Sequence, residues 1–211
     1  MSPLTDEARR FLLRLARRSL EAAVCGTVGG EETLSPSEVP RGLSVPAGAF
    51  VSLHKKGLLR GCIGYVHALH PLYRAVMQAA ASAALHDPRF PPVRPSELPD
   101  VNLEISVLSP SRAIRAEEIQ VGVHGLLIVQ DRQQGLLLPQ VAVEHQWDRE
   151  RFLEETCRKA GLSPDAWRRG ASIEAFTADV FGEELRPDGG PGGFAGAIPT
   201  PPDRPGKFPP R

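Results

Sequence analysis

The segment Leu59–Gly64 reads Leu-Arg-Gly-Cys-Ile-Gly and places a guanidinium and a thiol within one predicted strand. Alternation along an extended chain puts Arg60 and Cys62 on the same face of that strand. A guanidinium beside a thiol favours the thiolate and lowers the pKa of the cysteine. Cys62 is therefore a candidate nucleophile, and the alternative is a free cysteine that packs as a small apolar residue.

Two glycines flank this cysteine, although glycine weakens a strand. Gly61 and Gly64 therefore indicate a bulge, or a close approach by a ligand or by another stretch of backbone. We count both as candidate substrate-binding positions.

Two further residues are candidates for acid–base chemistry with this thiol. Glu104 lies on the polar face of a predicted strand, where its carboxylate can meet Arg60 or orient a histidine. His124 stands between two glycines, and a histidine that titrates near neutral pH suits a general base for a thiol. The alternatives are a surface salt bridge for Glu104 and an ordinary turn residue for His124.

Arg89 and Gln140 are candidates for holding a substrate. Arg89 lies in a proline-rich loop, and its planar guanidinium can bind a carboxylate or a phosphate. Gln140 follows a proline at a predicted strand end and can hydrogen-bond a substrate amide. Each also has a structural alternative, because Arg89 can bond loop carbonyls and Gln140 can satisfy a buried backbone group.

The sequence contains no complete metal-ligand or cofactor-binding motif. His67, His70 and His86 lie close in sequence, but zinc needs three or four converging ligands and no Cys-x-x-Cys pair completes such a set. The chain has no glycine-rich phosphate loop and no dinucleotide-binding fingerprint. We therefore predict no metal and no cofactor, with a site at the three histidines as the open alternative.

The elements that must position these residues follow from periodicity and from capping residues. In chain order we expect a helix, a hairpin, a helix, a strand, a hairpin, a helix and a final strand, at residues 5–25, 49–65, 71–86, 101–108, 125–138, 148–160 and 173–181. Short strands joined by hairpins with few helices predict an α+β fold with a mostly antiparallel sheet.

Length and composition bound the class of protein. The chain has 211 residues, and its 25 basic and 25 acidic side chains give no net charge, which argues against a general nucleic-acid binder. No apolar run reaches the length of a membrane span, and the N-terminus lacks the apolar region of a secretory signal. The three cysteines are far apart, as in reduced cytoplasmic proteins. We expect one domain over residues 1–186 and a disordered Pro/Gly-rich tail over residues 187–211.

The chain resembles the AMMECR domain family, also called AmmeMemoRadiSam system protein A, over about residues 8–185. The matching segments, in order, are Ala49–Leu53, Leu59–Gly64, Asp87–Pro92, Leu103–Leu108, Gly122–Leu126, Gly135–Ala142, Glu144–Asp148 and Phe152–Leu162. The resemblance implies an α+β fold with a larger and a smaller lobe that share one core, built as an internal duplication around a curved, barrel-like sheet. It also implies a Memo-like protein and a radical S-adenosylmethionine enzyme as partners.

Two functional hypotheses follow. In the first, Cys62 is the nucleophile of a pocket that acts on a small polar or anionic metabolite or nucleotide. His124 is then its base, and Arg60 and Glu104 assist it. In the second, the protein is a non-catalytic interaction module that uses Leu59–Gly64 as a docking groove.

Overall fold

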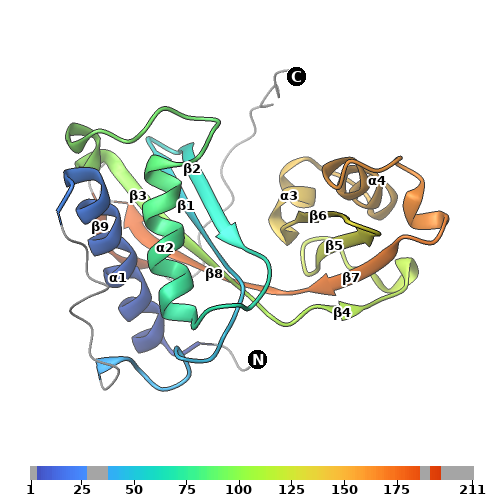
Figure 1. Cartoon of the computed structure of the whole chain (residues 1–211), viewed down its shortest axis with the longest axis horizontal. Coiled ribbons are helices and arrows are strands. Elements are labelled where there is room, and N and C mark those ends of the chain that lie inside the picture. Colours follow the sequence, from blue (N-terminus) through green and yellow to red (C-terminus); the bar gives the residue numbers. More distant parts are fainter. Residues whose placement is uncertain (1–3, 28–37, 186–190, 196–211) are drawn as a thin grey trace.

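The computed structural model describes residues 4–27, 38–185 and 191–195, which form a larger and a smaller lobe (Figure 1). The larger lobe contains α1 (Asp6–Cys25), β1 (Ala49–Lys55), β2 (Leu58–Tyr65), α2 (Leu72–Leu85), β3 (Val101–Leu108), β8 (Ala178–Leu185) and β9 (Pro191–Ala195). The smaller lobe contains β4 (Arg112–Ala113), β5 (Gly125–Gln130), β6 (Gln133–Leu137), α3 (Pro139–Glu144), α4 (Arg149–Lys159) and β7 (Ser172–Phe176). Short 3-10 helices span Pro95–Asp100, Ala116–Glu118 and Ala166–Arg168.

Each lobe is built on one antiparallel sheet. The strand order is β2-β1-β3-β8-β9 in the larger lobe and β4-β7-β5-β6 in the smaller lobe. The α+β prediction is therefore confirmed. Neither sheet closes into a barrel within the described part of the chain.

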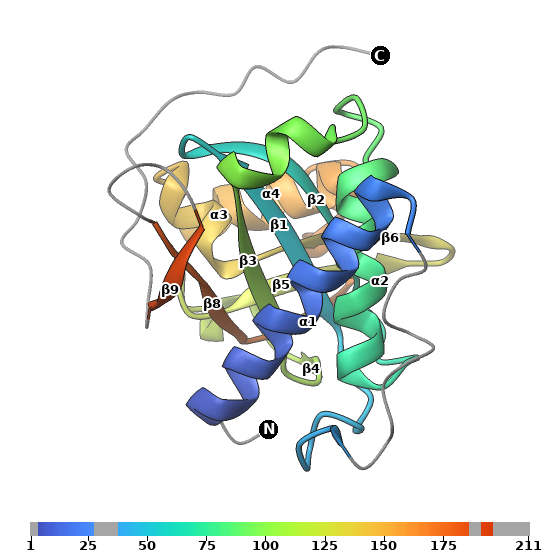
Figure 2. The same ribbon diagram turned by 90° about the vertical axis from the view of Figure 1, so that its left-hand side faces the viewer.

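Two helices cover one face of the larger sheet. Figure 2 shows α1 and α2 in front of β1 and β3. Thr5 caps α1 by accepting a hydrogen bond from the backbone N–H of Ala8 at 3.2 Å, as the sequence indicates. Leu12, Ala16 and Leu20 lie on the buried stripe of this helix at helical spacing. Burial of this stripe holds α1 against the sheet.

Strand β3 alternates as predicted. Val101, Leu103, Ile105 and Val107 belong to the core that α1 and α2 cover. The residues between them therefore point to the opposite face of the sheet. That second face carries the polar side chains of the candidate site.

The predicted final strand is in fact two strands that belong to different sheets. β7 pairs in the smaller lobe and β8 in the larger lobe, and the chain crosses between the lobes at Thr177. Ser109 lies at the other crossing: its N–H donates to the Thr177 carbonyl and its Oγ accepts from the Thr177 N–H, both at 2.9 Å. A period-two pattern runs through such a crossing without interruption, which explains the incorrect prediction of one strand.

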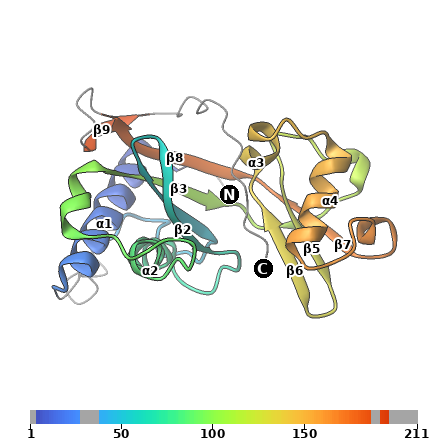
Figure 3. The same ribbon diagram turned by 90° about the horizontal axis from the view of Figure 1, so that it is seen from above.

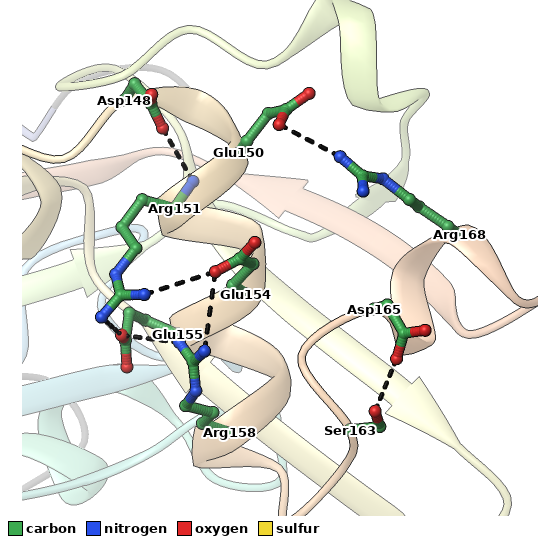
Figure 4. A network of polar contacts seen from close by, with 9 residues as sticks. All are labelled: Asp148, Glu150, Arg151, Glu154, Glu155, Arg158, Ser163, Asp165 and Arg168. Carbon is green, nitrogen blue, oxygen red and sulfur yellow. Dashed lines mark hydrogen bonds and ion pairs between the residues drawn. The ribbon is translucent and has the colours of Figure 1, made fainter.

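The smaller lobe has its own core, centred on Phe152, Leu153 and Cys157 of α4. The described residues thus form two clusters of buried apolar residues, one in each lobe. The outward face of α4 carries ion pairs instead, in which Arg151 and Arg158 each contact Glu154 and Glu155 (Figure 4).

Part of the predicted tail belongs to the fold. Residues 191–195 form β9, which pairs with β8 at the edge of the larger sheet. Backbone pairing with an edge strand does not require the apolar side chains whose scarcity predicted disorder. The rest of residues 187–211 lies outside the described residues.

Candidate functional site

Three polar side chains form a row across the larger sheet. Ser52 of β1 pairs with Cys62 of β2 on one side and with Glu104 of β3 on the other. All three lie on the face opposite α1 and α2, and the Ser52 hydroxyl donates to Cys62 Sγ at 3.3 Å. The sequence-predicted pair of Cys62 and Glu104 thus lies on one face with a single residue between them.

The backbone of Cys62 is held by an arginine–aspartate pair that follows α2. β2 is an edge strand, so the N–H and carbonyl of Cys62 that point away from β1 need partners outside the sheet. Asp87 Oδ2 accepts from the Cys62 N–H at 2.8 Å, and an Arg89 Nη donates to the Cys62 carbonyl at 3.1 Å. Arg89 also donates to both Asp87 carboxylate oxygens, at 2.9 and 2.7 Å. We call this pair the Asp87–Arg89 clamp.

The clamp requires an ionised Asp87, although this residue is buried. Burial opposes ionisation, but hydrogen bonds from the Arg89 guanidinium and from the backbone N–H groups of Cys62 and Arg89 outweigh it. The pKa of Asp87 therefore falls from 3.8 to about 2. Arg89 is predicted either to hold a substrate or to bond backbone carbonyls, and in the structure it donates to the Cys62 carbonyl. Its side chain is nevertheless 46% exposed.

Arg60 does not activate the thiol. Its guanidinium pairs with Glu97 at 3.0 Å and donates to the carbonyls of Pro91 and Pro92. These bonds, with help from Lys55, lower the pKa of Glu97 to about 2. A bulge in the β1–β2 ladder next to Arg60 shifts the register there, so simple alternation is a poor guide to the direction of this side chain.

The thiol of Cys62 has a raised pKa. Burial is the main cause, and the carboxylates of Asp87 and Glu104 add to it. The hydroxyl of Ser52 and the guanidinium of Arg89 act in the opposite direction without reversing the shift. The sequence predicts that Arg60 lowers the pKa of Cys62. In the structure the arginine that acts on the thiol is Arg89, and the pKa is raised overall.

Glu104 faces the smaller lobe. Burial raises its pKa, and so does the nearby charge of Glu144 at the end of α3. Glu144 is exposed overall, and partial desolvation of its carboxyl group raises its pKa, against a smaller opposite effect of His145. In Figures 1 and 3, α3 lies on the side of the smaller lobe that faces the larger lobe. The row on the sheet therefore meets a carboxyl group from the other lobe.

The glycines of the motif serve the packing of strands and helices. A Cβ on Gly61 would lie 2.2 Å from the carbonyl oxygen of Ala83, so the absence of a side chain lets β2 approach the backbone of α2. A Cβ on Gly64 would lie 2.4 Å from the carbonyl oxygen of Ala49 and from the ring of Phe50. The prediction of a close approach is confirmed, and the partner is protein backbone.

His124 and Gln140 both lie in the smaller lobe. The backbone N–H of Gln120 donates to His124 Nδ1 at 3.2 Å, and no hydrogen bond or ion pair among the described residues joins His124 to Cys62 or Glu104. Gln140 lies in the first turn of α3, four residues before Glu144 and thus on the same side of that helix.

The three histidines considered as metal ligands point to different partners. His67 Nε2 lies 3.3 Å from Gln134 Oε1, His70 packs edge-on against Tyr65, and His86 caps α2 through its backbone. In the part of the chain that the structure describes, no group of three or more His, Cys, Asp or Glu side chains is arranged to hold a metal ion.

Sequence reasoning did not single out four residues on or beside this face. Ser52 and His54 alternate on β1, Asn102 pairs with His54 from β3, and Asp87 holds the Cys62 backbone. Alternation alone could have identified Ser52 and His54 as neighbours of the Glu104 face. Only the fold reveals the role of Asp87, because the residue that it bonds, Cys62, is 25 positions away in the sequence.

Comparison with known proteins places this geometry in a family. The AMMECR1 family profile matches residues 13–181, which include the smaller lobe, most of the larger lobe and the whole candidate site. The chain belongs to the AMMECR1 family. The resemblance of its motifs is thus confirmed at the level of the family.

Archaeal AMMECR1 relatives match nearly their whole length. A protein of Methanothermobacter thermautotrophicus is 42% identical over 191 residues, covering 87% of this chain and 98% of the relative. Protein PF1979 of Pyrococcus furiosus is 43% identical over 196 residues, with coverages of 87% and 92%. The crystal structure of uncharacterized protein PH0010 from Pyrococcus horikoshii matches with a TM-score of 0.82 and 40% identity, covering 91% of this chain and 97% of that chain. These comparisons establish the family and fold, and none of their names states a reaction.

None of the helices in the described part of the chain is long and apolar enough to cross a membrane.

Proposed function

We propose that this AMMECR1 protein is a thiol-dependent enzyme in which Cys62 reacts with a small polar metabolite. The observation that carries the proposal is the hydrogen bond of 3.3 Å from the Ser52 hydroxyl to Cys62 Sγ, next to Glu104 on the same face. A hydroxyl that donates to sulfur stabilises the thiolate form. Glu104 replaces His124 as the proposed proton acceptor, because it is the titratable group next to this pair.

The raised pKa of Cys62 implies a resting thiol and fits an addition reaction. The sulfur forms a bond to an electrophilic carbon of a C=X group, and the π electrons move to X. The thiol proton passes by way of the Ser52 hydroxyl, which lies between the two residues, to the Glu104 carboxylate, and the same path returns it to X. Glu104 has a raised pKa, so it is a stronger base than an ordinary carboxylate.

The Asp87–Arg89 clamp supports this role by fixing the strand that carries the sulfur. Hydrogen bonds to both backbone groups of Cys62 fix the position of the strand from which the thiol projects. The exposed part of Arg89 supports an extension of the ligand class to anionic metabolites or nucleotides.

The experiment is a search for adducts on the intact protein. The purified chain is incubated with a fraction of small polar metabolites, and the peptides with Cys25, Cys62 and Cys157 are weighed separately. We expect an adduct on Cys62 that disappears in Cys62→Ser and forms more slowly in Glu104→Gln. Cys157→Ser is the matched control, because Cys157 is buried in the core of the other lobe. A Cys62 thiol that stays inert in the folded protein, towards metabolites and alkylating reagents alike, contradicts the proposal.

The proposed partners of this protein are a Memo-like protein and a radical S-adenosylmethionine enzyme, as the family resemblance implies. Mixing the purified proteins and measuring a change in the rate of adduct formation at Cys62 tests this. No change in rate and no co-elution contradicts it.

A docking module is the second candidate. Leu58 precedes the segment Leu59–Gly64 and Leu59 begins it, and the two are 66% and 42% exposed, although leucine is usually buried. If the protein is a docking module, replacing Leu58 and Leu59 by serine weakens partner binding and leaves the reaction of Cys62 with small alkylating reagents unchanged. Partner binding that survives the double replacement excludes the docking module.

A further inference from the structure

Asn102 is the only asparagine of the chain and is buried on β3 without a partner for its oxygen. The residue is 6% exposed, and its Oδ1 atom makes no hydrogen bond. A buried acceptor without a donor costs free energy, so natural proteins rarely leave one without a reason. This atom is therefore a candidate for binding something that is not part of the chain.

The side chain of Asn102 lies on the same face of the sheet as the candidate site. Asn102 and Glu104 are two residues apart on β3, so they share the face opposite the core residue Leu103. Across the ladder Asn102 pairs with His54 while Glu104 pairs with Ser52, the donor to Cys62. The unpartnered oxygen thus belongs to the face that carries the thiol.

This part of the face presents acceptors and negative charge. Glu104 offers carboxylate oxygens, and Ser52 offers lone pairs because its proton is directed at sulfur. His54 is half-buried and desolvation lowers its pKa, so the neutral ring keeps one acceptor nitrogen. Glu144 adds a carboxyl group from α3. The nearby cation, Arg89, is bonded to Asp87 and the Cys62 carbonyl.

We infer that Asn102 and Glu104 form the recognition part of the Cys62 site and bind a primary ammonium group of the ligand. Such a group supplies several N–H donors and a positive charge, which match an unpartnered amide oxygen beside a carboxylate. The inference rests on the proposed function, because it assumes that the ligand reacts at Cys62.

Three small thiosulfonates that modify cysteines test the inference. They carry an aminoethyl group, a trimethylammonioethyl group or a sulfonatoethyl group, so they differ in charge and in N–H donors. Rates are measured at one neutral pH on the full chain by peptide mass, and the exposed Cys25 of the same molecules serves as internal reference. At each cysteine, the quantity compared is the rate with the aminoethyl reagent divided by the rate with the trimethylammonioethyl reagent. We expect this ratio to be about tenfold higher at Cys62 than at Cys25, which is the effect of one charge-assisted hydrogen bond.

The decisive variant is Asn102→Leu, which keeps the branched shape of the side chain and removes the acceptor. A preference that arises only from the larger size of the trimethyl group persists in this variant, whereas a preference that arises from hydrogen bonding is lost. A purely structural role changes only the resistance of the protein to unfolding. Ser19→Ala is the matched control, because Ser19 Oγ is also buried without a partner but lies on α1, in another layer.

The outcomes separate the two proposals. Loss of the aminoethyl preference in Asn102→Leu but not in Ser19→Ala supports the inference. Equal relative rates for the two cations, or a preference that survives Asn102→Leu, overturns the inference and leaves Cys62 as a reactive thiol. A Cys62 thiol that none of the three reagents modifies overturns the proposed function, and the inference with it.

Discussion

The carboxylate of Asp87 accepts a hydrogen bond from the backbone N–H of Cys62 at 2.8 Å, although 25 residues separate the two. Asp87 follows the end of α2, and Cys62 lies on the edge strand of the larger sheet. The bond therefore joins the helix layer to the strand that carries the thiol. Since Asp87 also holds Arg89, its removal leaves both a backbone donor and a guanidinium without their partner.

We expect Asp87→Ala to lower the free energy of unfolding by about 3 kcal/mol, because it removes one partner of a buried, charged hydrogen-bond network. The Asp87 side chain is 2% exposed, so water does not replace the lost carboxylate easily. Urea unfolding at neutral pH measures the change. Glu150→Ala is the control: Glu150 forms an exposed pair with Arg168, and its loss should cost less than about 1 kcal/mol. Equal effects of the two variants would contradict the role of Asp87.

Acid should weaken the protein through Glu97, whose pKa falls from 4.5 to about 2 because Arg60, the Arg94 N–H and Lys55 donate to it. A carboxyl group with a lowered pKa contributes stability above its ordinary pKa and loses it as the pH falls through the folded value. We expect the free energy of unfolding to fall between about pH 4.5 and pH 2, and to fall less steeply in Glu97→Gln. Unfolding curves at a series of pH values test this. Parallel pH profiles for the two proteins would exclude Glu97 as the cause.

The contrast between Arg60 and Arg89 shows how far the sequence predicts the site. Propensity and capping predict α1, α2, β3 and α4, because each follows from contacts that are local in sequence. Alternation also places Cys62 and Glu104 on the polar face. Which arginine approaches the thiol depends on a bulge in the β1–β2 ladder and on the loop after α2, and neither is a local property.

The elements that the sequence did not predict are short or depend on pairing with distant parts of the chain. α3 has six residues and begins at Pro139, which is too short for a helical period to be recognised. β4 has two residues and pairs with β7 from a distant part of the chain. Glu144, the lobe-facing end of α3, could therefore not be placed beside Glu104 before the fold was known.

The Cys62 thiol should titrate above its ordinary pKa of 9.0, and two neighbouring variants should shift it in opposite directions. Glu104→Gln removes a negative charge that raises the pKa of Cys62, so the midpoint of alkylation against pH should fall. Ser52→Ala removes a hydrogen bond that lowers this pKa, so the midpoint should rise. Peptide-resolved alkylation rates measure both. Shifts of the same sign would show that the row across β2, β1 and β3 does not control the thiol.

Gly61→Ala should destabilise the larger lobe by about 2 kcal/mol, as overpacked cores do. The added Cβ would lie 2.2 Å from the Ala83 carbonyl oxygen, so α2 would have to move away from β2. Thermal unfolding together with the alkylation rate of Cys62 is the measurement. A melting temperature equal to that of the original protein would show that α2 yields without cost, and would return Gly61 to the set of candidate ligand-binding positions.

Glu144→Gln tests whether the two lobes share one site. Glu144 lies on α3 of the smaller lobe and raises the pKa of Glu104 on β3 of the larger lobe, in addition to the effect of burial. Removing this charge should lower the pKa of Glu104, which NMR titration of its side-chain carboxyl measures directly. Glu154→Gln is the matched control, because Glu154 pairs with Arg151 and Arg158 on the outward face of α4. A Glu104 titration that Glu144→Gln leaves unchanged would mean that the lobes are too far apart in solution for their carboxyl groups to interact, and the proton acceptor of Cys62 would then belong to the larger lobe alone.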